Sequence, residues 1–208
     1  MSRRTITIAA ALSVLALGSP LTTACANPLA NNSFNSGVDK YEQGDYQGAI
    51  ADYTKAIDIN PKYANAFVNR GAAKDELGDY QGAIADYTRA TEINPQHVNA
   101  YNNRGEAKRK LKDYQGAIVD YNKAIEIDPQ HANAYSNRGI AKLELKDYQG
   151  AIVDYTKAIE INPQSAPAYN NRGNARELVN DLEGACRDWR KAADFGLTQP
   201  AEWVKKQC

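Results

Sequence analysis

The sequence predicts an all-α fold of repeated helix pairs, because a 34-residue period runs through it and apolar residues recur at helical spacing within each period. Residues 98–131 form one such unit. Asp113 is placed to cap a helix that Pro129 ends. A shorter apolar stripe precedes it, so we expect two helices joined by a turn at Lys112 and Asp113. Apolar residues at positions i, i+3, i+4, i+7, i+10 and i+11 define one face of the second helix: Tyr114, Ala117, Ile118, Tyr121, Ala124 and Ile125.

The same unit recurs on both sides of this stretch without a slip in register. A Gly, an Ala, an aromatic residue, a second Ala and a Pro recur 34 residues apart: Gly37, Gly71, Gly105, Gly139 and Gly173; Ala49, Ala83, Ala117, Ala151 and Ala185; Tyr53, Tyr87, Tyr121, Tyr155 and Trp189; Ala56, Ala90, Ala124, Ala158 and Ala192; Pro61, Pro95, Pro129 and Pro163. This framework resembles the tetratricopeptide repeat (TPR). The resemblance implies a right-handed α-solenoid of five copies, at residues 30–63, 64–97, 98–131, 132–165 and 166–197.

Two positions depart from the usual pattern of that family. The large apolar residue expected before the Gly is replaced by Arg70, Arg104, Arg138 and Arg172, and the aromatic residue expected three after it by Lys40, Lys74, Lys108, Lys142 and Arg176. An unpaired buried Arg is costly, so we expect each Arg to pair with an Asp of a second helix in a structural role. The sequence leaves open whether pairing occurs within a copy or with the next. The five candidate partners are Asp52, Asp86, Asp120, Asp154 and Asp188.

Composition and motifs argue against several classes of function. The formal net charge is zero, which disfavours a non-specific nucleic-acid binder. The two histidines, His97 and His131, have no accompanying ligand spacing that indicates a metal, and the sequence contains no phosphate loop or nucleophile elbow. We therefore expect no enzyme activity, no cofactor and no metal.

Residues 1–26 differ from the repeats and resemble an export signal. Arg3 and Arg4 precede an apolar run that is too short to span a membrane, and Ala24-Cys25-Ala26 has the small residues of a cleavage site. Cleavage would place the mature start near Asn27. A lipoprotein anchored through Cys25 is the alternative, although Thr22 stands where a branched aliphatic residue is usual. We expect a location in the periplasm, outside the cell or in a thylakoid lumen, with membrane attachment only through a lipidated Cys25.

Two cysteines remain in the expected mature chain, Cys186 and Cys208. An even number in an oxidising compartment favours a disulfide between them. The bond would attach a C-terminal capping helix, predicted at 198–208, to the last repeat. The alternative is a buried Cys186 and a free terminal thiol.

Amides recur along the predicted first helices. In the TPR family these helices line the concave surface, so the amide row resembles the asparagine ladder with which some TPR superhelices hold an extended peptide. An amide both donates and accepts, so it can bind a peptide backbone whatever its side chains. The candidate residues are Asn35, Asn69, Asn103, Asn137 and Asn171, and, four residues earlier, Asn65, Asn99 and Asn133. The alternatives are helix capping for the earlier set and a relic of duplication for the later one.

Other groove positions vary between copies, and these could give specificity. One variable position holds Ala72, Glu106, Ile140 and Asn174, and another holds Asp75, Arg109, Leu143 and Glu177. The sequence thus predicts a monomeric adaptor for a protein or an extended peptide. A structural module that assembles by end-to-end stacking is the alternative, and the divergent first and last copies argue against it.

Overall fold

The structure, a computed structural model, describes residues 27–198 and Cys208. Within these residues it contains ten α-helices and no strand, which confirms the predicted fold class. The helices are α1 (Pro28–Glu42), α2 (Tyr46–Ile59), α3 (Ala64–Glu76), α4 (Tyr80–Ile93), α5 (Val98–Lys110), α6 (Tyr114–Ile127), α7 (Ala132–Glu144), α8 (Tyr148–Ile161), α9 (Ala166–Leu178) and α10 (Leu182–Asp194). The predicted export signal lies outside the described residues, and so does almost all of the predicted capping helix.

Each second helix begins with the same aspartate cap. The carboxylate of Asp113 accepts a hydrogen bond of 2.9 Å from the backbone N–H of Gly116, as predicted for an N-cap. A Cβ atom on Gly116 would lie 2.1 Å from Asp113 Oδ2. The recurrence of glycine three residues after each cap is explained by this contact, since the carboxylate occupies the space of a side chain.

The first helices of copies three and four begin with histidine. His97 Nδ1 accepts a hydrogen bond from the N–H of Ala100, and His131 Nδ1 accepts one from Ala134. The alternative assignment of caps to the earlier asparagines is therefore wrong. Asn65, Asn99 and Asn133 each lie one residue inside their helix, where a side chain cannot act as the N-cap.

The interior of each helix pair is an aromatic ring set against a glycine. Tyr121 is fully buried, and a Cβ atom on Gly105 would lie 2.7 Å from its ring. The same contact joins Gly37 to Tyr53, Gly71 to Tyr87, Gly139 to Tyr155 and Gly173 to Trp189. The first helix thus needs glycine there because the ring packs directly against its backbone.

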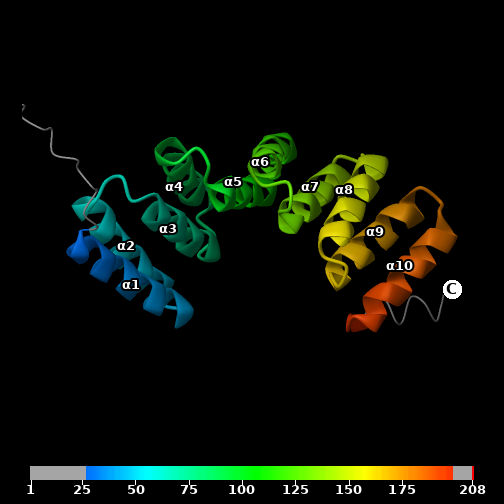
Figure 1. Cartoon of the computed structure of the whole chain (residues 1–208), viewed down its shortest axis with the longest axis horizontal. Helices are drawn as coiled ribbons and strands as arrows, with labels where there is room; N and C mark the ends of the chain where they lie inside the picture. The colour runs from blue at the N-terminus through cyan, green and yellow to red at the C-terminus, as the bar shows by residue number, and fades with distance from the viewer. Residues whose placement is uncertain (1–26, 199–207) are drawn as a thin grey trace, which may run out of the picture.

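The helix pairs follow one another along an arch (Figure 1). The helices α3 and α5 lie on its inner side and α4 and α6 on its outer side. Successive first helices also contact one another, as expected on the shorter, inner side of a curved stack. None of the helices between residues 27 and 198 is both long and apolar enough to span a membrane.

Candidate peptide-binding groove

The later asparagines lie along α1, α3, α5, α7 and α9, and most of them are half-buried. Asn35 is exposed, whereas Asn69, Asn103, Asn137 and Asn171 are half-buried. Asn137 Nδ2 donates to Asn102 Oδ1 of the preceding copy at 3.1 Å, and Asn102 in turn donates to Asn103. The amides of α5 and α7 are therefore linked side chain to side chain across the copies.

Two of these asparagines also contact the buried tyrosine of the preceding copy. Burial raises the pKa of Tyr53, and a hydrogen bond with Asn69 acts in the opposite direction. Burial likewise raises the pKa of Tyr87, which hydrogen-bonds Asn103. Asn69 and Asn103 thus each contact the preceding copy.

The earlier asparagines have a different environment. His97 Nε2 lies 3.1 Å from Asn65 Oδ1, and His131 Nε2 lies 3.4 Å from Asn99 Oδ1. Because Nδ1 of each ring accepts from a backbone N–H, a neutral ring carries its proton on Nε2 and donates it to the asparagine. Asn65, Asn99 and Asn133 are exposed, and the first two connect α3 and α5 to the histidine that caps the next first helix.

Two hollows open beside the half-buried amides. The first has a volume of about 200 Å³ and is lined by Tyr41, Ala72, Asp75, Glu76, Tyr87, Asn102, Asn103 and Glu106. The second, of about 270 Å³, is lined by Val38, Tyr41, Glu42, Tyr53, Asn69 and Ala72. They share Tyr41 and Ala72, so together they form one surface, the N-terminal groove, that runs from α1 to α5.

Of the two predicted variable residues Glu106 and Arg109, Glu106 lines this groove and Arg109 does not. Arg109 Nη2 is 2.5 Å from Glu106 Oε1, and Tyr121 donates to Glu106 Oε2 at 3.2 Å. Burial opposes ionisation of Glu106, but the hydrogen bond from Arg109 and its charge outweigh burial and lower the pKa of this carboxyl. Glu106 is therefore a carboxylate at neutral pH, while Arg109 is engaged within its own helix.

Several groove residues, Tyr41 and Glu76 among them, were missed at the sequence level. Tyr41 is the copy-one equivalent of the variable position of Asp75 and Arg109, so extending that series by one copy would have found it. Glu76 follows Asp75 and accepts a hydrogen bond of 3.4 Å from the Tyr41 hydroxyl. Burial, and then the charge of Glu76, raise the pKa of Tyr41 to about 12.

The departures from the family pattern form one charged cluster in each of copies two to five. Arg104 Nε and Nη2 bind the buried Asp120 at 3.0 and 2.5 Å, and Lys108 Nζ lies 2.7 Å from the same carboxylate. Arg104 Nη1 donates to Thr88 of the preceding copy at 3.2 Å, and the guanidinium lies 5.4 Å from the centre of the Tyr101 ring. Pairing occurs within the copy, which answers the question that the sequence left open, and the arginine also bonds to the copy before it.

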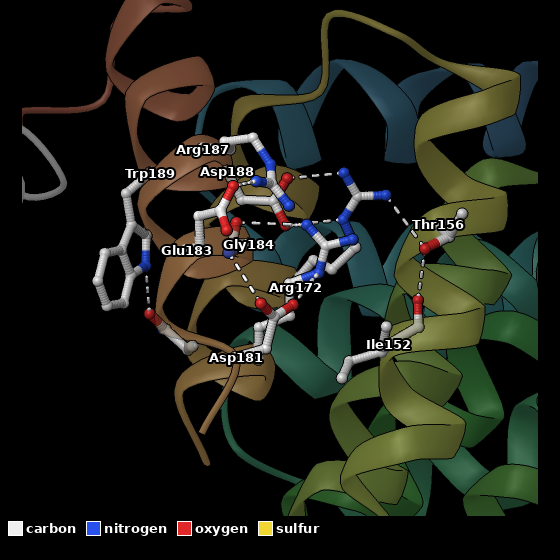
Figure 2. A network of polar contacts seen from close by, with 11 residues as sticks. Ile152, Thr156, Arg172, Asp181, Glu183, Gly184, Arg187, Asp188 and Trp189 are labelled. Carbon is white, nitrogen blue, oxygen red and sulfur yellow. Dashed lines mark hydrogen bonds and ion pairs between the residues drawn. The ribbon is translucent and has the colours of Figure 1, made fainter. Parts of the chain in front are cut away.

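Figure 2 shows the equivalent cluster at the last copy. Arg172 lies between Thr156 on α8 and Asp188 on α10, with distances of 3.1 Å to Thr156 Oγ1 and 2.7 Å from Nη2 to Asp188 Oδ1 (Figure 2). Arg176 also binds Asp188, at 2.8 Å. The unusual arginines therefore have a structural environment away from the N-terminal groove.

Copy one carries Ser36 in place of the arginine. Asp52 is bound there by Lys40, Lys55 and the Ser36 hydroxyl, at 2.6, 2.7 and 2.7 Å. The hydrogen bond from Lys40, followed by those from Lys55 and Ser36, holds the pKa of Asp52 well below its usual range. The fifth aspartate is thus paired as well.

The structure joins Cys186 to Cys208 by a disulfide, with 5.7 Å between the Cα atoms. Cys186 lies on α10, so the end of the chain is attached to the last helix pair. Arg190 Nη2 also donates to the backbone oxygen of Cys208 at 3.3 Å. Within the described residues, no group of three or more His, Cys, Asp or Glu side chains is placed to hold a metal.

Comparison with known families matches the repeats directly. A tetratricopeptide repeat model matches residues 98–131 and 132–165, a TPR repeat model matches residues 37–74 and 76–111, and a further tetratricopeptide repeat model matches residues 154–187. The chain belongs to the tetratricopeptide repeat family. No curated protein matches it.

Solved structures of TPR proteins share its architecture. The chain is 25% identical to the MamA protein over 80% of its own length and 91% of that chain, with a TM-score of 0.72. For PilF of Pseudomonas aeruginosa the identity is 17%, the coverage 82% and 78%, and the TM-score 0.76. YrrB is described as a TPR protein with an unusual peptide-binding site. The chain is 20% identical to YrrB over 85% of its own length and 92% of that chain, with a TM-score of 0.69. This TPR architecture is that of a scaffold for protein–protein interaction.

Proposed function

We propose that this protein is a non-catalytic adaptor that holds an extended peptide against the inner side of its arch, with the backbone bonded by the amides of successive first helices. The observation that carries this proposal is the placement of Asn69 and Asn103 in the linings of two adjoining hollows. Asn137, one copy further on, is joined to Asn102. Amides beside open hollows supply donors and acceptors at copies two and three, which suits a peptide backbone that repeats both.

Recognition through the backbone predicts tolerance of peptide sequence. A set of unrelated nine-residue peptides with capped ends should bind with dissociation constants of the same order, as measured by fluorescence anisotropy. N-methylation of alternate backbone nitrogens of the peptide should weaken binding, because it removes N–H groups that donate hydrogen bonds to the asparagine side-chain oxygens. Peptides that bind equally well when N-methylated would contradict the proposal.

The four-residue variant Asn69→Ala, Asn103→Ala, Asn137→Ala and Asn171→Ala tests the row itself. We expect binding to weaken at least about tenfold, since each net hydrogen bond contributes about 0.5–1.5 kcal/mol. Some loss of thermal stability is also expected, because Asn69 and Asn103 hydrogen-bond buried tyrosines. Binding is therefore measured well below the melting temperature.

The second helices offer a matched control in four exposed amides with the same period: Gln47, Gln81, Gln115 and Gln149. Their replacement by alanine should leave peptide binding unchanged. Equal affinity in the asparagine variant and this control would remove the amide row as the binding element.

We also propose that the protein is exported. The Cys186–Cys208 disulfide supports this, because disulfides persist in oxidising compartments. Protein sequencing of the chain recovered from the producing cell should begin near Asn27. A chain blocked at a lipid-modified Cys25 would identify the lipoprotein alternative, and a chain that retains Arg3 and Arg4 would contradict export by cleavage.

A further inference from the structure

The N-terminal groove has a strongly uneven charge. Its lining contains the four carboxylates Glu42, Asp75, Glu76 and Glu106, and none of its described lining residues is a Lys or an Arg. The chain as a whole has no net charge. The excess of negative charge is therefore local to one part of the inner surface, beside Asn69 and Asn103.

Two of these four carboxylates are paired with a cation, Glu106 with Arg109 and Asp75 with Lys110. Lys110 Nζ lies 2.7 Å from Asp75 Oδ2, but Asp75 Oδ1 is shielded from water and accepts no hydrogen bond from any residue that the structure describes. Glu76 accepts one long hydrogen bond, from Tyr41, and forms no ion pair within the described residues. Glu42 and Glu76 are exposed and form no ion pair within the described residues, so they are the carboxylates that a bound cation can reach.

The second hollow adds an apolar wall next to this charge. Val38, Tyr41, Tyr53 and Ala72 line it, and Tyr41 and Ala72 continue into the acidic hollow. A Lys or Arg side chain has the same division, with an apolar stem and a cationic head. Its stem would pack along Tyr41 and Ala72 while the head reaches the carboxylates of α3 and α5.

We propose that the N-terminal groove receives a Lys or Arg side chain of the bound peptide. This inference rests on the proposed function and adds the chemistry of the ligand. The corresponding variable positions in copy four are Ile140 and Leu143, which are apolar. The acidic groove of the first three copies therefore has no equivalent at copy four, and this places the cationic residue of the peptide at the N-terminal part of the arch.

The test uses capped nine-residue peptides that are identical except at the central residue, which is Lys, Arg, Nε-acetyl-lysine or Glu. Anisotropy titrations should show Lys and Arg peptides binding at least tenfold tighter than the acetyl-lysine peptide, and the Glu peptide weakest. Acetylation removes the charge but keeps the stem, so the ratio isolates the cation. The preference should fall as salt is raised from 50 to 500 mM, by screening.

Two variants place the effect in the groove. The first is Glu76→Gln, at an exposed residue that forms no described ion pair, and the second combines Asp75→Asn with Glu76→Gln. Each should reduce the preference for Lys over acetyl-lysine to less than threefold. The affinity for the acetyl-lysine peptide should stay unchanged. The control Glu92→Gln with Glu126→Gln, at exposed residues of α4 and α6, should keep the full preference. Because Glu76→Gln leaves the Asp75–Lys110 pair intact, it remains a test if the double variant unfolds.

The remaining results of these titrations would each show which part of the proposal is wrong. Equal binding of all four peptides, with sensitivity to backbone N-methylation retained, would overturn the cationic subsite and leave the proposed function standing. A Lys preference that survives in both groove variants would overturn its location. Absence of binding by every peptide to the wild-type chain would overturn both proposals.

Discussion

A left-handed backbone residue ends the first helix of each copy, and its identity varies. Gly44 and Gly78 hold this conformation with φ of 79°, whereas Lys112, Lys146 and Asn180 hold it with φ of 63°, 62° and 65°. A Cβ atom in this region costs about 1–2 kcal/mol. Copies three to five therefore carry local strain that copies one and two avoid.

Lys112→Gly and Lys146→Gly should each raise the free energy of unfolding by about 0.5–1 kcal/mol. Relief of about 1–2 kcal/mol of strain exceeds the roughly 0.4–1 kcal/mol by which glycine stabilises the unfolded chain. Urea unfolding measures the change. Lys157→Gly, inside α8, is the control and should lower stability by about 1 kcal/mol. If Lys112→Gly lowers the free energy of unfolding as much as Lys157→Gly does, the turn carries no strain.

At the scale of the helix, the starts of α5 and α7 depend on a titratable cap. His97 accepts from the N–H of Ala100 through Nδ1, which requires an unprotonated nitrogen. Burial lowers the pKa of His97 below its ordinary value. The second helices, by contrast, are capped by aspartates such as Asp79 and Asp113.

Stability should fall as the pH decreases from about 6.5 through the lowered pKa of His97. As the pH falls, the unfolded chain binds a proton at His97 at a higher pH than the folded chain does. The contribution of His97 to the free energy of unfolding is therefore complete above its unfolded pKa and is lost as the pH falls through its folded pKa. Thermal melts between pH 7.5 and 5 measure this. His97→Asn keeps an accepting cap without the titration, so its curve should be flatter over this range. An unchanged slope in that variant would assign the pH dependence to other groups.

At the scale of the whole molecule, stability is a sum over neighbouring copies. Each inner copy is bonded to the one before it through its arginine, as Arg104 is to Thr88 and Arg138 to Asn122. In copy five, the Cys186–Cys208 disulfide joins α10 to Cys208. The two ends of the array are thus stabilised by different means.

Reduction of this disulfide, or Cys186→Ser with Cys208→Ser, should destabilise the C-terminal end selectively. Closure of a loop with a sequence separation of 22 is worth about 3 kcal/mol in the chain-entropy model. Hydrogen exchange should become faster in α9 and α10 and stay unchanged in α3 to α6, because each copy contacts only its neighbours. Equal acceleration along the whole array would show that it unfolds as one unit.

The order of the helices was predictable from residue spacing because each copy is a local structure. The cap at Asp113, the stop at Pro129 and the buried face through Tyr121 all involve residues within one copy. The first-helix caps were not predicted, because the sequence offered asparagine as an alternative at Asn65 and Asn99. The general preference for asparagine at N-caps did not identify the cap residue. The backbone geometry did, since it places His97 and His131 at the N-caps of α5 and α7.

The sequence by itself determined the fold class, the number of copies and the pairing of unusual charges, since these follow from a short period repeated many times. Only the tertiary structure decided that each Asp is bound within its own copy while its Arg reaches back to the previous one. It also decided that Tyr41, Asp75 and Glu106, from three copies, line one hollow. The reason is physical: curvature of the stack brings side chains of successive copies together, and curvature arises from packing between copies, which spacing within a copy does not specify.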